Sequence, residues 1–324
     1  METDVSANSG LEQPNVSPLT PIFRRAILLG ATNPVVAAVV RRYGMRLGAA
    51  RFVAGETFEE AMPVLKGLNE RGLRTNTTLL GEGVRDDAAA QRVVDDYRSV
   101  LDRIADAALT TNVALKLTHL GLDLGEEVAW ANVLAIVERA ESHSNFIRID
   151  MEESDRVDAT LRIFRRLREE GHEQVGTVLQ SALHRTEDDL RRLVALRPNL
   201  RLVKGAYLEP AAVAHQRKAA VDAAYLRLAE RMLGEIPFTA IATHDERMIE
   251  RVIGLASARG LGPEQYEFQM LYGIRPKLQG DLARQGHRVL VATPFGPQWY
   301  PYLMRRLAER PANLLFFGQS LVRR

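Results

Sequence analysis

The sequence of 324 residues contains no cysteine. Disulfides, thiolate nucleophiles and cysteine-ligated metals are therefore excluded, and any redox chemistry requires a cofactor. A strong charge of one sign is also missing, because 43 Lys and Arg stand against 41 Asp and Glu for a formal net charge of +2. Without a long basic block, nucleic acid is disfavoured as the main partner, and a site for a small molecule fits better.

Long hydrophobic runs are absent as well. No stretch approaches the roughly 18 apolar residues of a membrane-spanning helix. The first 20 residues are acidic and polar, unlike a secretory signal, and they lack apolar periodicity. We expect a cytoplasmic protein with a disordered tail at residues 1–20 and a single domain from residue 21 to residue 324.

The rest of the chain alternates between short apolar runs and longer amphipathic stretches. Helical segments are expected over roughly residues 22–70, and amphipathic patterns continue at 86–109, 156–170, 186–196, 220–235 and 246–260. Eight runs rich in Val, Ile, Leu and Thr predict strands. These runs lie at residues 75–82, 112–121, 145–153, 174–182, 199–207, 238–246, 266–273 and 288–296.

Strands and helices in strict alternation predict a parallel sheet with right-handed crossovers. Eight units favour a closed (β/α)₈ barrel of the TIM type, which commonly has this length as one domain. A doubly wound open sheet is the alternative. Against a nucleotide-binding version of it, no GxGxxG follows the first strand, since the nearest stretch, "GEGVRD", lacks the third glycine.

Polar residues gather at the carboxyl ends of the predicted strands, where barrel enzymes build their active sites. Singly, each of these residues could cap a helix or lie in a loop, but their common placement predicts one site. They are Glu82, Lys116 with His119, Asp150, Gln180, Lys204 with Tyr207, Thr243 with His244, and Gln269.

Three classes of protein could use polar residues gathered at the strand ends, which form the mouth of a barrel. A metal hydrolase could draw only on the loose set Asp150, His244 and Asp245, and the chain has neither HExxH nor HxH on the first strand. A Schiff-base lyase could use Lys116 or Lys204. A noncatalytic binding barrel is disfavoured by the number of ionisable residues at strand ends.

An arginine doublet follows the eighth predicted strand in "WYPYLMRRLAERPANLLFF". On a helix, Tyr302, Arg305, Arg306 and Glu309 share an arc of roughly 100°, opposite an apolar face. This polar face is either a solvated surface or an anion clamp, because paired guanidinium forks match a carboxylate. Its place after the eighth strand favours the clamp.

Taken in order, "IDMEE", "TVLQSA", "LRLVKGAYLEP", "IATHDE", "YEFQMLYGIR" and "WYPYLMRRLAERPAN" closely resemble the proline dehydrogenase family, in its short bacterial monofunctional form. The resemblance extends from about residue 25 to the end. It implies a distorted (β/α)₈ barrel with extra N-terminal helices that binds FAD at the strand ends, and no bound metal.

The resemblance also implies roles for individual residues. Arg305, Arg306 and Lys116 would hold the substrate carboxylate, and Tyr302 and Tyr207 would wall the ring. Arg201 would lie near the flavin N5, Asp150 would support the catalytic charge network, and these two are the catalytic candidates. The remaining expected cofactor contacts are Met151, Gln180, Lys204, Gly205, Ala206, Thr243 and His244.

The implied reaction oxidises L-proline to Δ1-pyrroline-5-carboxylate with hydride transfer to FAD, the first step of proline catabolism. Quinone would reoxidise the flavin, which implies transient contact with a membrane surface, and a separate pyrroline-5-carboxylate dehydrogenase would take the product. One position departs from the family. Ala292 in "VLVATPFG" stands where a tyrosine is usual. Either Phe295 fills the space or the pocket accepts a related cyclic secondary amino acid, such as hydroxyproline.

Overall fold

The computed structural model describes residues 38, 40, 42–45 and 48–309. Two compact units are distinguished, one comprising residues 50–299 and the other residues 1–49 with 300–324, and each is described by itself. The predicted tail at residues 1–20 lies outside the described residues, as does most of the helical region predicted before residue 58. A single domain over 21–324 stays a prediction.

Residues 50–299 form a closed parallel barrel of eight strands in sequential order. The barrel closes because β1 pairs with β8 as well as with β2. The (β/α)₈ prediction is confirmed, and the open doubly wound sheet is wrong. The strands are β1 (Arg74–Leu79), β2 (Thr111–Leu115), β3 (Ile147–Ile149), β4 (Val175–Gln180), β5 (Asn199–Val203), β6 (Phe238–Ala242), β7 (Tyr266–Leu271) and β8 (Val289–Phe295).

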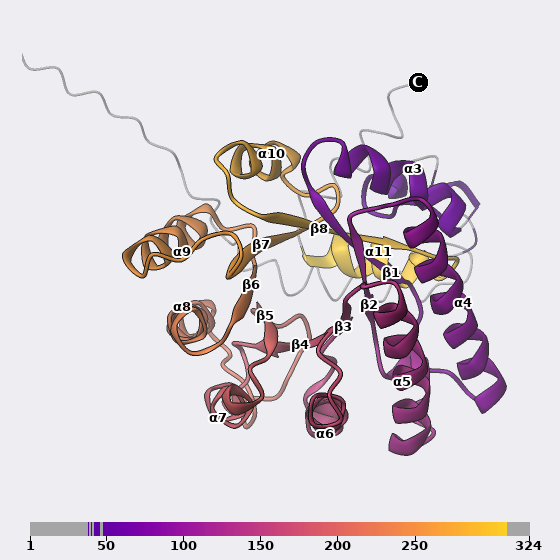
Figure 1. Ribbon diagram of the computed structural model, residues 1–324, viewed down its shortest axis with the longest axis horizontal. Helices are drawn as coiled ribbons and strands as arrows, with labels where there is room; N and C mark the ends of the chain where they lie inside the picture. The colour runs from indigo at the N-terminus through magenta and orange to yellow at the C-terminus, as the bar shows by residue number, and fades with distance from the viewer. Residues whose placement is uncertain (1–37, 39, 41, 46–47, 310–324) are drawn as a thin grey trace, which may run out of the picture. The chain divides into compact units, whose positions relative to one another are not determined.

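Helices α4 to α10 stand outside the strands and are readily followed around the barrel in Figure 1. Several helices begin at a residue whose side chain caps the helix. Asp86 accepts a hydrogen bond from the Ala89 amide at 2.7 Å to start α4, and Asp245 accepts one from Arg247 to start α9. The helices are α3 (Phe58–Asn69), α4 (Asp87–Asp106), α5 (Glu126–Ser142), α6 (Val157–Glu169), α7 (Thr186–Leu193), α8 (Lys218–Glu235), α9 (Glu246–Ala258), α10 (Pro276–Arg284) and α11 (Trp299–Glu309).

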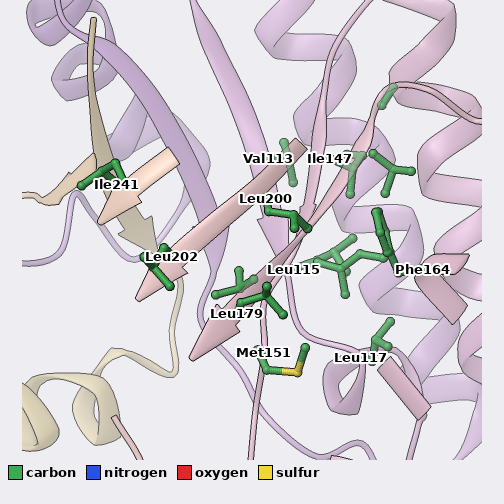
Figure 2. Packing of buried hydrophobic residues seen from close by; sticks show 14 of the residues in the cluster. Val113, Leu115, Leu117, Ile147, Met151, Phe164, Leu179, Leu200, Leu202 and Ile241 are labelled. Atoms are coloured by element: carbon green, nitrogen blue, oxygen red, sulfur yellow. The ribbon is translucent and has the colours of Figure 1, made fainter. Parts of the chain in front are cut away.

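The apolar core lies between the barrel wall and the helices. Alternate strand residues face outward and pack on the apolar stripes of the helices. Leu115 of β2, Ile147 of β3 and Phe164 of α6 are each fully buried there, and Figure 2 shows these side chains close together. The hydrophobic effect of this shell closes the ring and so brings all eight strand ends to one mouth.

The inside of the barrel, by contrast, is strongly polar. Arg148 of β3 is 2% exposed and lies over the Phe146 ring, with its guanidinium carbon 4.8 Å from the centroid. Its Nη1 donates to the carbonyl oxygens of Thr177 and Asn199 at 2.9 and 2.8 Å. Burial, together with the positive charge of Arg201, lowers the pKa of Arg148 to about 9.

Space for the Arg148 guanidinium depends on a glycine in β4. A Cβ on Gly176 would lie 2.4 Å from the Asn199 carbonyl oxygen and 2.5 Å from Arg148 Nη1. We expect Gly176→Ala to destabilise the protein by about 1–3 kcal/mol through overpacking, measured by urea denaturation. In the control Gly67→Ala, the new Cβ meets no atom within 4 Å, so a helix position gains about 0.5–1 kcal/mol. Equal stability of the two variants would contradict the packing argument.

Candidate active site

The carboxyl ends of the strands carry the polar and ionisable residues that the sequence predicted there. Because the strands are parallel and the ring closes, Lys116 after β2, Asp150 after β3, Gln180 at the end of β4 and Lys204 after β5 lie around one mouth. The helices and loops that follow these strands add the neighbouring groups. The result is a concentration of charge at one end of the barrel.

Arg201 is the centre of this arrangement. It lies in β5, and its Nη1 donates to Asp150 Oδ1 at 2.7 Å in an ion pair that is largely buried. Its Nε donates to Gln269 Oε1 on β7, the next strand but one in the barrel. The third nitrogen, Nη2, is buried and has no hydrogen-bond partner among the residues that the structure describes. A buried guanidinium N–H without a partner is costly, so this atom points to a ligand that would accept from it.

Lys116 and Glu82 form an ion pair between the loops that follow β2 and β1. Lys204 pairs with Asp222 on α8 at 2.7 Å and lies 3.9 Å from Asp245. Both lysines proposed as Schiff-base nucleophiles are therefore in contact with carboxylates. The partners Glu82 and Asp222 are 34 and 18 residues away in sequence, and Asp222 had not been singled out.

Gln180, at the end of β4, and Gly205, after β5, lie next to each other at the mouth of the barrel. Gln180 Nε2 donates to the Glu152 carbonyl oxygen at 2.8 Å, which fixes the amide. Gly205 has a φ of +111°, and a Cβ there would lie 3.1 Å from Gln180 Oε1. A left-handed backbone without a side chain lets a large ligand approach the chain closely. Ala206 next to it is exposed, whereas Met151 is buried and appears in Figure 2 near Leu179.

Glu152 was not predicted, although it ties two loops of the mouth together. Its carboxylate accepts from the Thr118 amide at 3.1 Å and from Thr118 Oγ1 at 2.6 Å. Burial raises the pKa of Glu152, and the Thr118 hydrogen bonds oppose that rise. The glutamate doublet in "IDMEE" is the only sequence signal for it, and that signal does not say which of the two is buried.

Thr243 and His244 directly follow β6, and both accept hydrogen bonds from backbone amides. Thr243 Oγ1 accepts from the Asp245 amide at 3.1 Å, and His244 Nε2 accepts from the Leu271 amide at 2.9 Å. With Asp150 engaged by Arg201 and His244 by backbone, the loose metal set from the sequence is committed to other contacts. Across the described part of the chain, no group of three His, Asp or Glu side chains could hold a metal ion.

Tyr207 follows β5 and is half-buried. Burial raises the pKa of its phenol, and the negative charges of Glu152 and Glu153 add to the effect. The hydroxyl therefore keeps its proton at neutral pH and remains a hydrogen-bond donor.

The arginine doublet lies on α11, as the helical pattern predicted. Arg306 places its guanidinium carbon 5.4 Å from the centroid of the Tyr302 ring, one turn earlier. The side chain of Arg305 lies outside the described residues. At the start of α11, Trp299 is buried and its Nε1 donates to Glu56 Oε1 at 2.8 Å. The predicted contact of the doublet with a substrate stays a prediction.

Comparison with known proteins identifies a family. Residues 61–319 match the model of the proline dehydrogenase family. Proline dehydrogenase 1 of Bacillus subtilis strain 168 is 40% identical over 303 residues, which cover 94% of this chain and 100% of that protein. The proline dehydrogenase of Deinococcus radiodurans is 42% identical over 306 residues, covering 93% and 98%.

Longer proteins also match. The crystal structure of proline utilization A from Bdellovibrio bacteriovorus has the same fold, with a TM-score of 0.78, 24% identity and coverage of 89% of this chain. A variant of proline utilization A from Bradyrhizobium japonicum gives a TM-score of 0.70 at 28% identity over 89% of this chain. The chain spans only 36% and 33% of these two proteins. It likewise spans 24% of the bifunctional protein PutA of Escherichia coli, at 28% identity.

Proposed function

Because this chain belongs to the proline dehydrogenase family, we propose that it oxidises L-proline to Δ1-pyrroline-5-carboxylate, the first step of proline catabolism, with FAD as the bound electron acceptor. The observation that carries the proposal is Arg201, held by Asp150 and Gln269 and with its buried Nη2 unpartnered among the described residues. Such a donor suits the electron-rich edge of a reduced flavin. In this role Arg201 and Asp150 are the catalytic residues.

The residues at the mouth fit a flavin. Gly205 offers backbone at close approach, Gln180 offers a fixed amide, and Met151 an apolar surface. The remaining proposed cofactor contacts are Lys204 and Ala206, which follow β5, and Thr243 and His244, which follow β6. When bound, FAD supplies the hydride acceptor for the carbon beside the ring nitrogen of proline.

Substrate binding is proposed for the cations. Lys116, Arg305 and Arg306 would hold the proline carboxylate, so that the opposite end of the small rigid ring faces the cofactor. Tyr207 and Tyr302 would close the sides of the ring. This division requires the chain to supply orientation and charge, while the cofactor supplies the redox chemistry.

A direct test is the visible spectrum of the purified protein. We expect yellow protein that releases FAD on denaturation and bleaches under anaerobic L-proline, and no activity with NAD as acceptor. The bleaching separates a proline dehydrogenase from a lyase, a metal hydrolase or a binding barrel. A colourless preparation that stays inactive after reconstitution with FAD would refute the proposal.

Ala292 bears on the choice of substrate. It pairs with Asn76 of β1 and Leu271 of β7 and is only partly buried, and its small side chain stands where the family usually has an aromatic ring. Phe295, the alternative filler, is buried and stacks edge-on against Phe58 at 5.5 Å. The second candidate function is therefore oxidation of a larger cyclic secondary amino acid such as hydroxyproline.

We expect Ala292→Tyr to lower KM for proline and to narrow the range of analogues oxidised, by about 1–3 kcal/mol in relative kcat/KM. The measurement is steady-state kinetics on proline and hydroxyproline. Ala292→Val, which adds little volume, serves as the control and should change the profile only slightly. An unchanged profile in the tyrosine variant would show that position 292 does not contact the substrate.

The electron acceptor and the next enzyme complete the proposal. Quinone would reoxidise the flavin through peripheral contact with the inner face of the membrane, and a separate pyrroline-5-carboxylate dehydrogenase would consume the product. Within the described residues, no helix is long and apolar enough to span a bilayer. Reduction of a soluble quinone analogue by proline, followed with the purified protein, tests the acceptor.

A further inference from the structure

A row of side-chain hydrogen bonds runs through the interior of the barrel. At the end opposite the mouth, Arg288 Nε donates to Glu267 Oε2 at 2.9 Å. The other oxygen of Glu267 accepts from Gln269 Nε2, and Gln269 Oε1 accepts from Arg201 Nε. Arg201 then reaches Asp150 at the mouth at 2.7 Å. The row thus links Arg288, just before β8, through β7 and β5 to Asp150, just after β3.

Glu267 is a carboxylate in an unusual place. Its side chain is 3% exposed, whereas its partner Arg288 is 26% exposed. Burying a carboxylate is expensive unless it is paired and hydrogen-bonded. Residues inside small barrels are commonly branched and apolar. A buried glutamate on β7 therefore needs an explanation beyond stability.

The donors and acceptors along the row supply an explanation for the buried glutamate. A carboxylate can only accept, so the side of the Gln269 amide that faces Glu267 must be the NH₂ group. The amide oxygen is then forced toward Arg201, whose Nε can only donate. With Nε and Nη1 both engaged, the guanidinium plane is fixed by two bonds. Its remaining nitrogen, Nη2, is left with no partner among the described residues and points to the place of a ligand.

We propose that Glu267 is a positioning residue for the redox centre, acting through Gln269 to fix the orientation of Arg201. This inference rests on the proposed function, because Arg201 is the residue assigned to the flavin. It assigns Glu267 a role that its distance from the mouth would not suggest. Glutamine at position 267 could not impose this orientation, because its own amide can turn either its oxygen or its NH₂ group toward Gln269.

Kinetics of flavin reduction provide the first test. In anaerobic stopped-flow mixing with proline, we expect Glu267→Gln and Gln269→Leu each to lower the limiting reduction rate at least about tenfold, with the apparent Kd for proline within twofold of wild type. The double variant should be no slower than the worse single variant, because both changes break the same row. Additive losses, or an unchanged limiting rate, would overturn the proposal.

Two controls separate positioning from a structural role. Glu264→Gln changes an exposed glutamate just before the same strand and should match wild type. Arg288→Lys keeps a cation beside Glu267 but loses the planar fork and the contact with the Phe238 ring, which lies 4.9 Å away. It should lower the unfolding midpoint and leave the reduction rate within threefold. A reduction rate that falls with stability alike in Arg288→Lys and Glu267→Gln would mean that Glu267 is only structural.

The midpoint potential of the bound flavin provides a test that does not depend on turnover. Gln269→Leu removes the link but no charge, so a shift in midpoint potential reports the position of Arg201 alone. We expect reduced flavin to lose about tenfold in relative affinity, a fall of about 30 mV for a two-electron couple. An unshifted potential would contradict the proposed row.

The row can also be tested if the protein holds no flavin. In urea unfolding of the apoprotein, Glu267→Gln and Arg201→Lys should be coupled at least fivefold in the unfolding equilibrium constant, although their side chains share no hydrogen bond. The same coupling measured in a Gln269→Leu background should fall below twofold. Persistence of the coupling without Gln269 would refute the row, whereas failure of proline to bleach the holoprotein would refute the proposed function alone.

Discussion

Replacement of Arg305 or Arg306 by methionine is expected to lower kcat/KM for proline at least about thirtyfold. Each arginine is proposed to make a charge-assisted hydrogen bond to the substrate carboxylate in a water-poor site, and its loss leaves that anion partly unpaired. Truncating one partner of such a pair costs roughly 2–5 kcal/mol, and 2 kcal/mol corresponds to about thirtyfold. Steady-state kinetics measure the loss, with flavin content and melting temperature checked for each variant.

Lysine substitutions sharpen this test. Arg305→Lys and Arg306→Lys keep the charge but replace the planar fork by a point charge, so they should recover only part of the loss. Arg284→Met on α10, whose side chain is 72% exposed and paired with Asp281, is the control for removing a surface arginine. It should change the activation free energy derived from kcat/KM by well under 1 kcal/mol.

The competing interpretation of the doublet is a solvated helix face. It predicts effects below 1 kcal/mol for the doublet variants too. Near-normal kcat/KM in both methionine variants would place the anion clamp elsewhere. Lys116 would then be the residue to replace, since it lies at the mouth beside Glu82.

Most of the barrel could be predicted because its signals are local. Short runs such as "FTAIA" and "VGTVL" are too apolar to face water and too short for buried helices, and Asp86 and Asp245 mark where helices begin. Eight repeats of one unit then determine the topology. Since barrel strands end on one side, the placement of Lys116, Asp150 and Gln180 followed from strand order alone.

The polar interior could not be predicted in the same way. A glutamate in "YEFQML" or an arginine in "IRI" looks like the solvent face of a half-buried strand. Only closure of the ring turns that face inward, and closure is a property of all eight strands together. The partner of Glu267, Arg288, lies 21 residues away, and no local pattern connects the two.

The roles of individual residues were the hardest feature to predict from sequence patterns. The pairing of Lys116 with Glu82 depends on the course of two loops. The position of Arg305 on a helix after the eighth strand favoured an anion clamp, but the identity of the anion and the role of Gly205 came from resemblance to a family, since a helix face or a lone glycine is compatible with many structures. Family membership supports the reaction, while the assignment of each side chain stays a prediction that the variants above address.

A buried histidine makes the fold sensitive to acid. His119, expected in a loop, lies in a short 3₁₀ helix (Thr118–Leu120) and is 5% exposed. Its ring packs so closely on Gly81 that a Cβ there would lie 2.2 Å from Nε2. Burial lowers the pKa of His119 from 6.5 to about 4; the positive charge of Lys116 lowers it further, and the negative charge of Glu82 opposes the shift.

The direction of the effect follows from the depressed pKa. Below pH 6.5 the unfolded chain binds a proton at His119 more readily than the folded protein does, so stability is present above that pH and is lost as the pH falls toward 4. With these pKa values the loss between pH 7 and pH 5 is about 2 kcal/mol, since one pKa unit corresponds to about 1.4 kcal/mol. His119→Gln removes this titration. In urea unfolding we expect wild type to lose about 2 kcal/mol more than the variant between pH 7 and pH 5, whereas the exposed His184→Gln should follow wild type. A His119→Gln variant that loses as much stability as wild type over this interval would show that the histidine is protonated in the folded protein.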